Sequence, residues 1–215
     1  MNIYSFVSPI AETNTYCLIH NDECLMIDAV RSDELHTFLL ENGIKKITVL
    51  LTHGHYDHVL GILDLRNEFE LMVVSSEKGP ELLGNTRKNL SAVANLIGSF
   101  RGSNNHIEPF TVEAQFFLKD REVFHWNGYE LQVRYTPGHS PDSVCYFLGE
   151  KYLFAGDTIF QNEYPMLRFP GGDKDTYYNY TKPIIDSWDG NLLVYPGHGG
   201  AFKLSASIVR KELDE

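Results

Sequence analysis

Thiols are scarce in this chain of 215 residues. The cysteines are Cys17, Cys24 and Cys145, an odd number with no Cys-x-x-Cys spacing. This pattern indicates neither a disulfide framework nor a thiolate zinc site. We expect the three side chains to fill apolar space within strands.

Long apolar runs and an excess of positive charge are also missing. The first residues show no basic segment followed by a long apolar stretch, and no run approaches membrane-spanning length. The sequence therefore predicts no membrane association and a cytoplasmic location. The 18 basic residues are outnumbered by 29 acidic ones, for a net charge of -11. Because this charge repels phosphate backbones, it argues against a nucleic-acid partner.

The chain also has no linker-like segment. No Ser, Pro or charge repeat divides it, and no low-complexity stretch is found. Since 43% of the residues are hydrophobic, the chain can bury a sizeable core. We expect one domain over residues 1–215, and nothing in the sequence predicts an oligomeric state.

Histidine is concentrated in one short segment. Residues 52–58 read Thr-His-Gly-His-Tyr-Asp-His and follow an apolar run that ends at Leu51. Imidazole nitrogens and carboxylate oxygens are ligands that zinc and its borderline neighbours accept. A strand ending at Leu51 would deliver His53 and His55 to one ion, with a backbone turn at Gly54. This segment therefore predicts a metal site.

Further candidate ligands lie in turn-like segments downstream. His139 lies in Thr-Pro-Gly-His, Asp157 in Gly-Asp-Thr and His198 in Pro-Gly-His. Asp57 and His58 cannot easily reach the ion of the first two histidines, so they are expected to face a second ion. A bridging carboxylate then completes two ligand sets: His53, His55, His139 and Asp157 for one ion, and Asp57, His58, Asp157 and His198 for the other. A single histidine in a Pro-Gly turn is usually a loop residue, but five of the nine histidines lie in these motifs.

The ordered motif series resembles the signature of the metallo-β-lactamase superfamily. It consists of His-x-His-x-Asp-His, Thr-Pro-Gly-His, Gly-Asp-Thr and Pro-Gly-His, and the resemblance runs from about residue 14 to residue 198. The chain looks most similar to glyoxalase II-like hydrolases. The resemblance implies an α/β fold, a four-layer αββα sandwich with a dinuclear site at one edge. It also implies that a metal-bridging hydroxide attacks an ester, thioester or amide carbonyl.

The expected mechanism is metal-assisted hydrolysis. Two divalent ions, most readily zinc, with iron or manganese as alternatives, lower the pKa of a bridging water toward about 7. One ion polarises the carbonyl while the other holds the leaving sulfur or oxygen. The candidate catalytic residues are Asp57, His58 and Asp157. Ligating histidines need an acceptor for the other ring N–H, and the candidates are Asp28, Thr52 and Thr158.

Three departures from the resembled family bear on the substrate. Only 17 residues follow His198 (215 minus 198), so we expect the C-terminal helical domain that grips glutathione in the resembled family to be missing. Where many relatives carry a Gly-Arg pair, this chain has Arg168, which is either a substrate anion contact or a surface residue. Asp142 stands where relatives commonly have Gly. We therefore expect small thioester or ester substrates with modest selectivity.

Other functions fit parts of the motif series. A persulfide dioxygenase would hold a single iron through His53, His139 and Asp157, a facial triad suited to oxygen chemistry. A lactonase or β-lactamase would share the mechanism and differ in substrate. A non-enzymatic metal-binding or regulatory protein is disfavoured because all the ligand positions are filled.

Hydrophobic periodicity predicts the elements around these motifs. Strands are expected at 3–8, 15–20, 24–28, 47–51, 71–74, 123–124, 131–135, 144–148, 152–154 and 192–195. Helices are expected from Ser32 to before Gly43 and over 57–69, 89–100, 173–186 and 204–213. The stretch 79–112 is the least regular. Its polar residues 101–106 either cover the active site or form a solvated loop, and we expect the solvated loop, which leaves His106 outside the ligand set.

Overall fold

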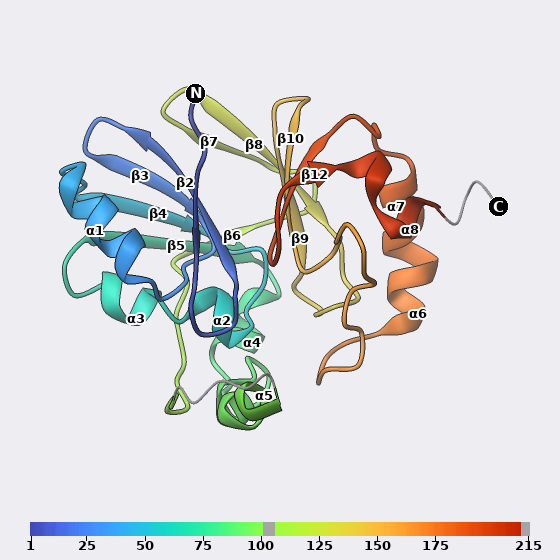
Figure 1. The fold of residues 1–215 in the computed structure, drawn as a ribbon, viewed down its shortest axis with the longest axis horizontal. Coiled ribbons are helices and arrows are strands. Elements are labelled where there is room, and N and C mark those ends of the chain that lie inside the picture. Colours follow the sequence, from blue (N-terminus) through green and yellow to red (C-terminus); the bar gives the residue numbers. More distant parts are fainter. Residues whose placement is uncertain (101–105, 212–215) are drawn as a thin grey trace. The chain divides into compact units, whose positions relative to one another are not determined.

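A computed structural model describes residues 1–100 and 106–211 of the chain. The chain divides into two compact units, residues 1–117 and 118–215, which are described in turn (Figure 1). The expectation of a single domain over the whole chain stays a prediction. None of the helices in the described ranges is both long and apolar enough to span a membrane.

The first unit is built on a mixed sheet with the strand order β1-β2-β3-β4-β5-β6. Neighbours are antiparallel from β1 to β3 and parallel from β3 to β5. Because β3, β4 and β5 run in one direction, their C-terminal ends share one edge of the sheet. The strands are β1 (Tyr4–Val7), β2 (Asn14–His20), β3 (Glu23–Ile27), β4 (Lys46–Leu50), β5 (Glu70–Ser76) and β6 (Phe116–Leu118).

Short helices connect the strands of this unit. They are α1 (Asp33–Glu41), α2 (Tyr56–Val59), α3 (Ile62–Leu65), α4 (Gly79–Leu83), the 3-10 turn η1 (Ser91–Val93) and α5 (Ala94–Phe100). Ser32 caps α1, where its hydroxyl accepts a hydrogen bond from the main-chain N–H of Leu35 at 3.4 Å. Leu35 and Leu39 of α1 pack with Met26 and Val49 in one buried apolar cluster, so α1 covers one face of the sheet (Figure 1).

The second unit has its own mixed sheet, in the order β12-β11-β10-β9-β8-β7. The pair β10 and β11 is parallel, and the other neighbours are antiparallel. It follows that β8, β10 and β11 run in the same direction and end at one edge of the sheet. The strands are β7 (Val123–Trp126), β8 (Tyr129–Tyr135), β9 (Val144–Leu148), β10 (Tyr152–Gly156), β11 (Leu193–Pro196) and β12 (Phe202–Lys203).

A continuous helical segment packs on the second sheet. It consists of α6 (Lys174–Thr176), the π-helical turn η2 (Tyr177–Thr181) and α7 (Lys182–Asp186), and it is followed later by the 3-10 turn η3 (Leu204–Ala206) and α8 (Ile208–Lys211). Tyr177 and Ile185 are buried in one cluster with Leu153 and Val194 of the strands. The helix expected over 173–186 is therefore confirmed, with a π-helical turn in its middle.

Three expected helices differ from the structure. The helix expected over 204–213 is interrupted at Ser207, whose extended backbone (ψ of 138°) separates η3 from α8, and residues 212–213 lie outside the described residues. The helix expected over 57–69 is broken between α2 and α3, where the main-chain N–H of Gly61 donates to the carbonyl of Ala29 at 2.8 Å. The chain passes so close here that a Cβ on Gly61 would lie 2.3 Å from the carbonyl oxygen of Val30. The helix expected over 89–100 begins only after Leu90, whose φ of 66° is left-handed and cannot continue a helix. The loop expected over 101–106 falls largely on residues 101–105, which lie outside the described residues.

Candidate metal centre

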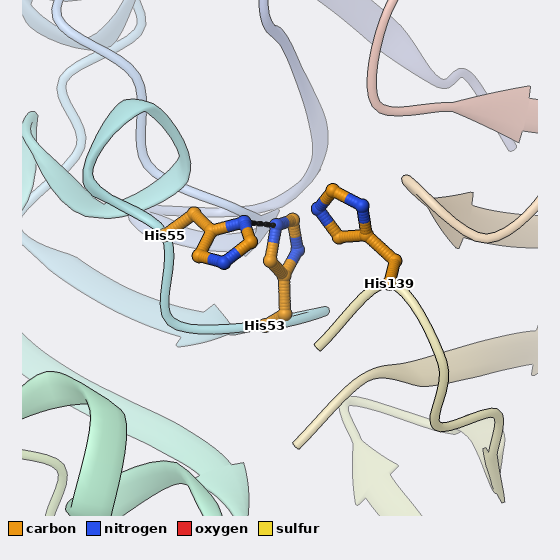
Figure 2. A group of neighbouring side chains, drawn as sticks. All are labelled: His53, His55 and His139. Atoms are coloured by element: carbon orange, nitrogen blue, oxygen red, sulfur yellow. Dashed lines mark hydrogen bonds between the residues drawn. The ribbon is translucent and has the colours of Figure 1, made fainter. Parts of the chain in front are cut away.

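His53 and His55 follow β4 at the C-terminal edge of the first sheet. Nε2 of His53 lies 3.1 Å from Nδ1 of His55, and both side chains are buried (Figure 2). Gly54 between them is not among the residues with positive φ, so the turn at this position does not require left-handed backbone. The expectation that these two rings converge is confirmed.

The carboxylate of Asp28 orients the ring of His58 directly and that of His53 through Thr52. Its oxygens accept the main-chain N–H and the hydroxyl of Thr52, each at 2.7 Å, and Oδ2 also lies 2.8 Å from Nδ1 of His58. The hydroxyl of Thr52 lies 3.1 Å from Nδ1 of His53. Because Nδ1 of both histidines faces an acceptor, the proton is assigned to Nδ1 and the lone pair to Nε2. Of the expected acceptors, Asp28 and Thr52 are confirmed by these contacts.

Asp57 lies in the first turn of α2. Its Oδ2 accepts a hydrogen bond from the hydroxyl of Thr13 at 3.0 Å and lies 4.0 Å from Nε2 of His58. The first unit thus presents a carboxylate oxygen and an imidazole nitrogen close together, beside the pair of His53 and His55.

The second unit carries the other three predicted ligands. His139, Asp157 and His198 follow β8, β10 and β11, which end at the same edge of the sheet. Oδ2 of Asp157 lies 3.6 Å from Nε2 of His139 and 3.5 Å from Nε2 of His198. Nδ1 of His139 lies 2.8 Å from the main-chain oxygen of Met166, which assigns the lone pair of His139 to Nε2. A single carboxylate oxygen therefore lies between two imidazole nitrogens.

Packed hydroxyl groups support these loops. Thr136 and Thr158 bond to each other through their hydroxyls at 3.1 Å, and the hydroxyl of Tyr177 donates to the carbonyl of Thr158 at 3.1 Å. Thr158 thus braces the backbone next to Asp157. The prediction that it accepts a ring N–H has no support in these contacts.

The spacing within each donor set fits a transition metal. Two ligand atoms bonded to one tetrahedral zinc at about 2.0–2.1 Å lie about 3.3 Å apart. The separations of 3.1, 3.5 and 3.6 Å are close to this value, and the 4.0 Å between Oδ2 of Asp57 and Nε2 of His58 is longer. The donors are the nitrogen and oxygen atoms that zinc, iron and manganese accept. The donor atoms described in each unit are therefore spaced as ligands of a divalent metal ion would be.

The remaining predicted residues lie apart from these donors. Arg168 is exposed, and its Nε lies 3.3 Å from the sulfur of Met166. Asp142 is buried and accepts the hydroxyl of Ser140 at 2.6 Å. His106 is exposed with Nε2 2.6 Å from Glu108, in agreement with its exclusion from the ligand set.

Sequence reasoning did not find two groups that hold these donors. They are the hydroxyl of Thr13 and the main-chain oxygen of Met166. A main-chain carbonyl carries no residue signature, and Thr13 precedes Asp57 by 44 positions, so no local spacing links them.

A comparison with models of known protein families identifies the family of this chain. The model described as metallo-beta-lactamase superfamily matches residues 11–198. The chain belongs to the metallo-β-lactamase superfamily. The resemblance seen in the motif series is thereby confirmed, as is the α/β fold class with two mixed sheets and flanking helices. Members of this superfamily are metallo-hydrolases that typically bind two divalent ions.

Curated relatives are similar over most of the chain. The probable metallo-hydrolase YqgX of Bacillus subtilis is 29% identical over 90% of this chain and 87% of its own length. A hydroxyacylglutathione hydrolase of Francisella philomiragia is 26% identical over 85% of this chain and 61% of its own length. An atrochrysone carboxyl ACP thioesterase of Aspergillus fumigatus is 31% identical over 94% of this chain. The chain spans 61% of the length of that hydroxyacylglutathione hydrolase and 55% of the length of that thioesterase.

Solved structures agree on the fold. The BLEG-1 B3 metallo-beta-lactamase has a TM-score of 0.74 and 26% identity, covering 100% of this chain and 97% of its own. TTHA1623, solved in a di-iron-bound form, has a TM-score of 0.72 and 23% identity over 96% of each chain. At 23% identity, the similarity to TTHA1623 supports only the fold.

Proposed function

We propose that the chain is a hydrolase of small thioesters or esters that works with two divalent metal ions. The proposed ligands are His53, His55, His139 and Asp157 for one ion, and Asp57, His58, Asp157 and His198 for the other. The observation that carries the proposal is the position of Asp157. Its Oδ2 lies 3.6 Å from Nε2 of His139 and 3.5 Å from Nε2 of His198, close to the separation of two ligand atoms on one zinc ion. The proposal assigns these two histidines to different ions, so Asp157 would be shared by both.

When bound, the two ions supply an acidified shared water and a Lewis acid for the substrate carbonyl. The chain supplies the orientation. Asp28 holds the Nδ1 proton of His58 and, through Thr52, that of His53. The main-chain oxygen of Met166 does the same for His139. Asp57 and Asp157 contribute the anionic charge that offsets two adjacent dications.

A pocket in the second unit is the proposed place for one arm of the substrate. It has a volume of about 270 Å³ and is lined by His198, by the buried Phe160 and Phe202 and by the exposed Glu163. It can take a short acyl or thiol group. Arg168 is the proposed contact for a substrate anion, since its neighbour Met166 contacts His139.

The activities named for two relatives support this substrate class. One is a hydroxyacylglutathione hydrolase and the other an acyl carrier protein thioesterase, and both names describe thioester cleavage. We propose that the chain cleaves several small thioesters with modest selectivity, because the proposed substrate contacts, Arg168 and the pocket beside His198, are few and convert little binding energy into selectivity.

Elemental analysis combined with two assays tests the proposal. We expect close to two zinc ions per chain after zinc-replete growth and hydrolysis of S-lactoylglutathione, other small thioesters and simple esters. A lactone in the same panel detects lactonase activity. One iron per chain together with oxygen uptake on glutathione persulfide would replace this function with the dioxygenase. The His106→Ala variant is the control and should match the parent protein, because His106 is exposed and pairs with Glu108.

A further inference from the structure

The turn between β1 and β2 is held in one conformation by Ser8. The main-chain N–H of Ser8 donates to the carbonyl of Thr13 at 2.8 Å, and its carbonyl accepts the N–H of Glu12 at 3.0 Å. Its hydroxyl accepts the N–H of Ile10 at 3.2 Å and donates to the carbonyl of Arg31 at 3.0 Å. The turn is therefore fixed both internally and to the segment after β3.

The residues that follow this turn reach two parts of the candidate metal centre. The hydroxyl of Thr15 donates to the carbonyl of Asp28 at 2.9 Å and accepts the N–H of Val30 at 3.0 Å. The hydroxyl of Thr13 donates to Oδ2 of Asp57 at 3.0 Å. Both threonine side chains are fully buried. Thr13, just before β2, thus braces the carboxylate of Asp57, and Thr15 within β2 braces the backbone at Asp28.

The carboxylate of Asp57 needs such a restraint. It is carried by α2, a helix of 4 residues with no side-chain hydrogen bond at its N-cap. Helices this short have little stability of their own. The side chain of Asp57 is 13% exposed, and its Oδ2 is the oxygen that also faces Nε2 of His58. A hydrogen bond from a rigid, buried hydroxyl fixes where this oxygen lies.

We propose that Thr13 is a positioning residue for the second metal ion. Its hydroxyl holds the carboxylate of Asp57 in the rotamer that serves as a ligand beside His58. This inference rests on the proposed two-metal function and extends it to the β1–β2 turn. The competing explanation is that the buried hydroxyl of Thr13 only needs an acceptor, in which case its removal would lower stability and leave metal binding unchanged.

Zinc titration of the metal-free protein against a chromophoric chelator separates the two explanations. Thr13→Val removes the hydroxyl at nearly constant volume, and we expect it to weaken the second zinc equivalent about 10–100-fold with little change in the first. Thr13→Ser keeps the hydroxyl and should stay within a few-fold of the parent. Ser75→Ala removes another buried hydroxyl of the same unit, which bonds to the carbonyl of Ser76, and should leave both equivalents unchanged.

Three results would overturn the inference. In the first, Thr13→Val binds the second equivalent as tightly as the parent. In the second, Thr13→Ser is as weak as Thr13→Val, which would make packing the cause. In the third, the parent protein takes up fewer than two equivalents, which would also remove the proposed function. If the parent binds two equivalents and cleaves no thioester or ester, the proposed function fails, while the zinc affinities still decide the role of Thr13.

Discussion

Nδ1 of His58 lies 2.8 Å from Oδ2 of Asp28, and both side chains are almost completely buried. Asp28 directly follows β3 and has a φ of 58°, which is uncommon for a residue with a side chain. A strained backbone persists only where its surroundings fix it, and such positions cluster at functional sites. Here the same carboxylate also accepts two hydrogen bonds from Thr52.

Replacing Asp28 should therefore cost stability even without metal. Asp28→Ala would leave the N–H and hydroxyl of Thr52 and the Nδ1 proton of His58 without their acceptor inside the protein. Since each such buried group costs about 1–3 kcal/mol, we expect a loss of about 2–4 kcal/mol after partial relaxation. Urea unfolding of the metal-free protein measures it. Asp22→Asn, which disrupts only the exposed pair with Lys45, should change stability by less than about 0.5 kcal/mol.

Gly138 precedes the candidate ligand His139 and should not tolerate a side chain. Its φ is 145°, and an added Cβ would lie 2.6 Å from Cβ of Tyr177, a buried residue whose hydroxyl donates to Thr158. We expect Gly138→Ala to lower the free energy of unfolding by about 2–4 kcal/mol. Gly128→Ala is the matched control, because Gly128 has a φ of 81° and open space around it, and it should lose only about 1–2 kcal/mol. Equal losses in thermal or urea unfolding would refute the steric argument.

The sequence predicted which side chains gather at these sheet edges because the candidate ligands follow strands. His53, His139 and His198 each come after an apolar run, and parallel strand directions bring such ends to one edge of each sheet. It could not predict where α2 stops. At that boundary the main-chain N–H of Gly61 donates to the carbonyl of Ala29 at 2.8 Å instead of within the helix, a tertiary contact that periodicity does not encode.

Alkaline stability should depend on Cys145. Burial raises the pKa of its thiol from an ordinary 9.0 to about 12, and burial likewise raises the pKa of Cys17 well above its usual value. Below pH 9 the thiol is protonated in both the folded and the unfolded state, so its contribution to stability is fully present. Between pH 9 and about 12 only the unfolded state loses the proton, so stability falls with pH by about 1.4 kcal/mol per unit for each such thiol.

The comparison of the parent with Cys145→Ala isolates this effect. Other groups that titrate at high pH affect both proteins and cancel in the difference. Between pH 8 and pH 10.5 we expect the parent to lose about 2 kcal/mol more than the variant in urea unfolding. Parallel stability curves for the two proteins over this range would contradict the raised pKa.

The last prediction separates the two proposed metal positions. Asp157→Ala should abolish hydrolysis and lower the content of both ions, because its Oδ2 lies near both His139 and His198 and its charge offsets two dications. His198→Ala should mainly deplete the second ion and leave His53, His55, His139 and Asp157 to hold the first. Metal content and thioester hydrolysis are measured for both variants beside His106→Ala. Equal metal loss in the two ligand variants would mean that Asp157 is not shared and that His198 has been assigned to the wrong ion, while an inactive His106→Ala would place a further ligand outside the proposed set.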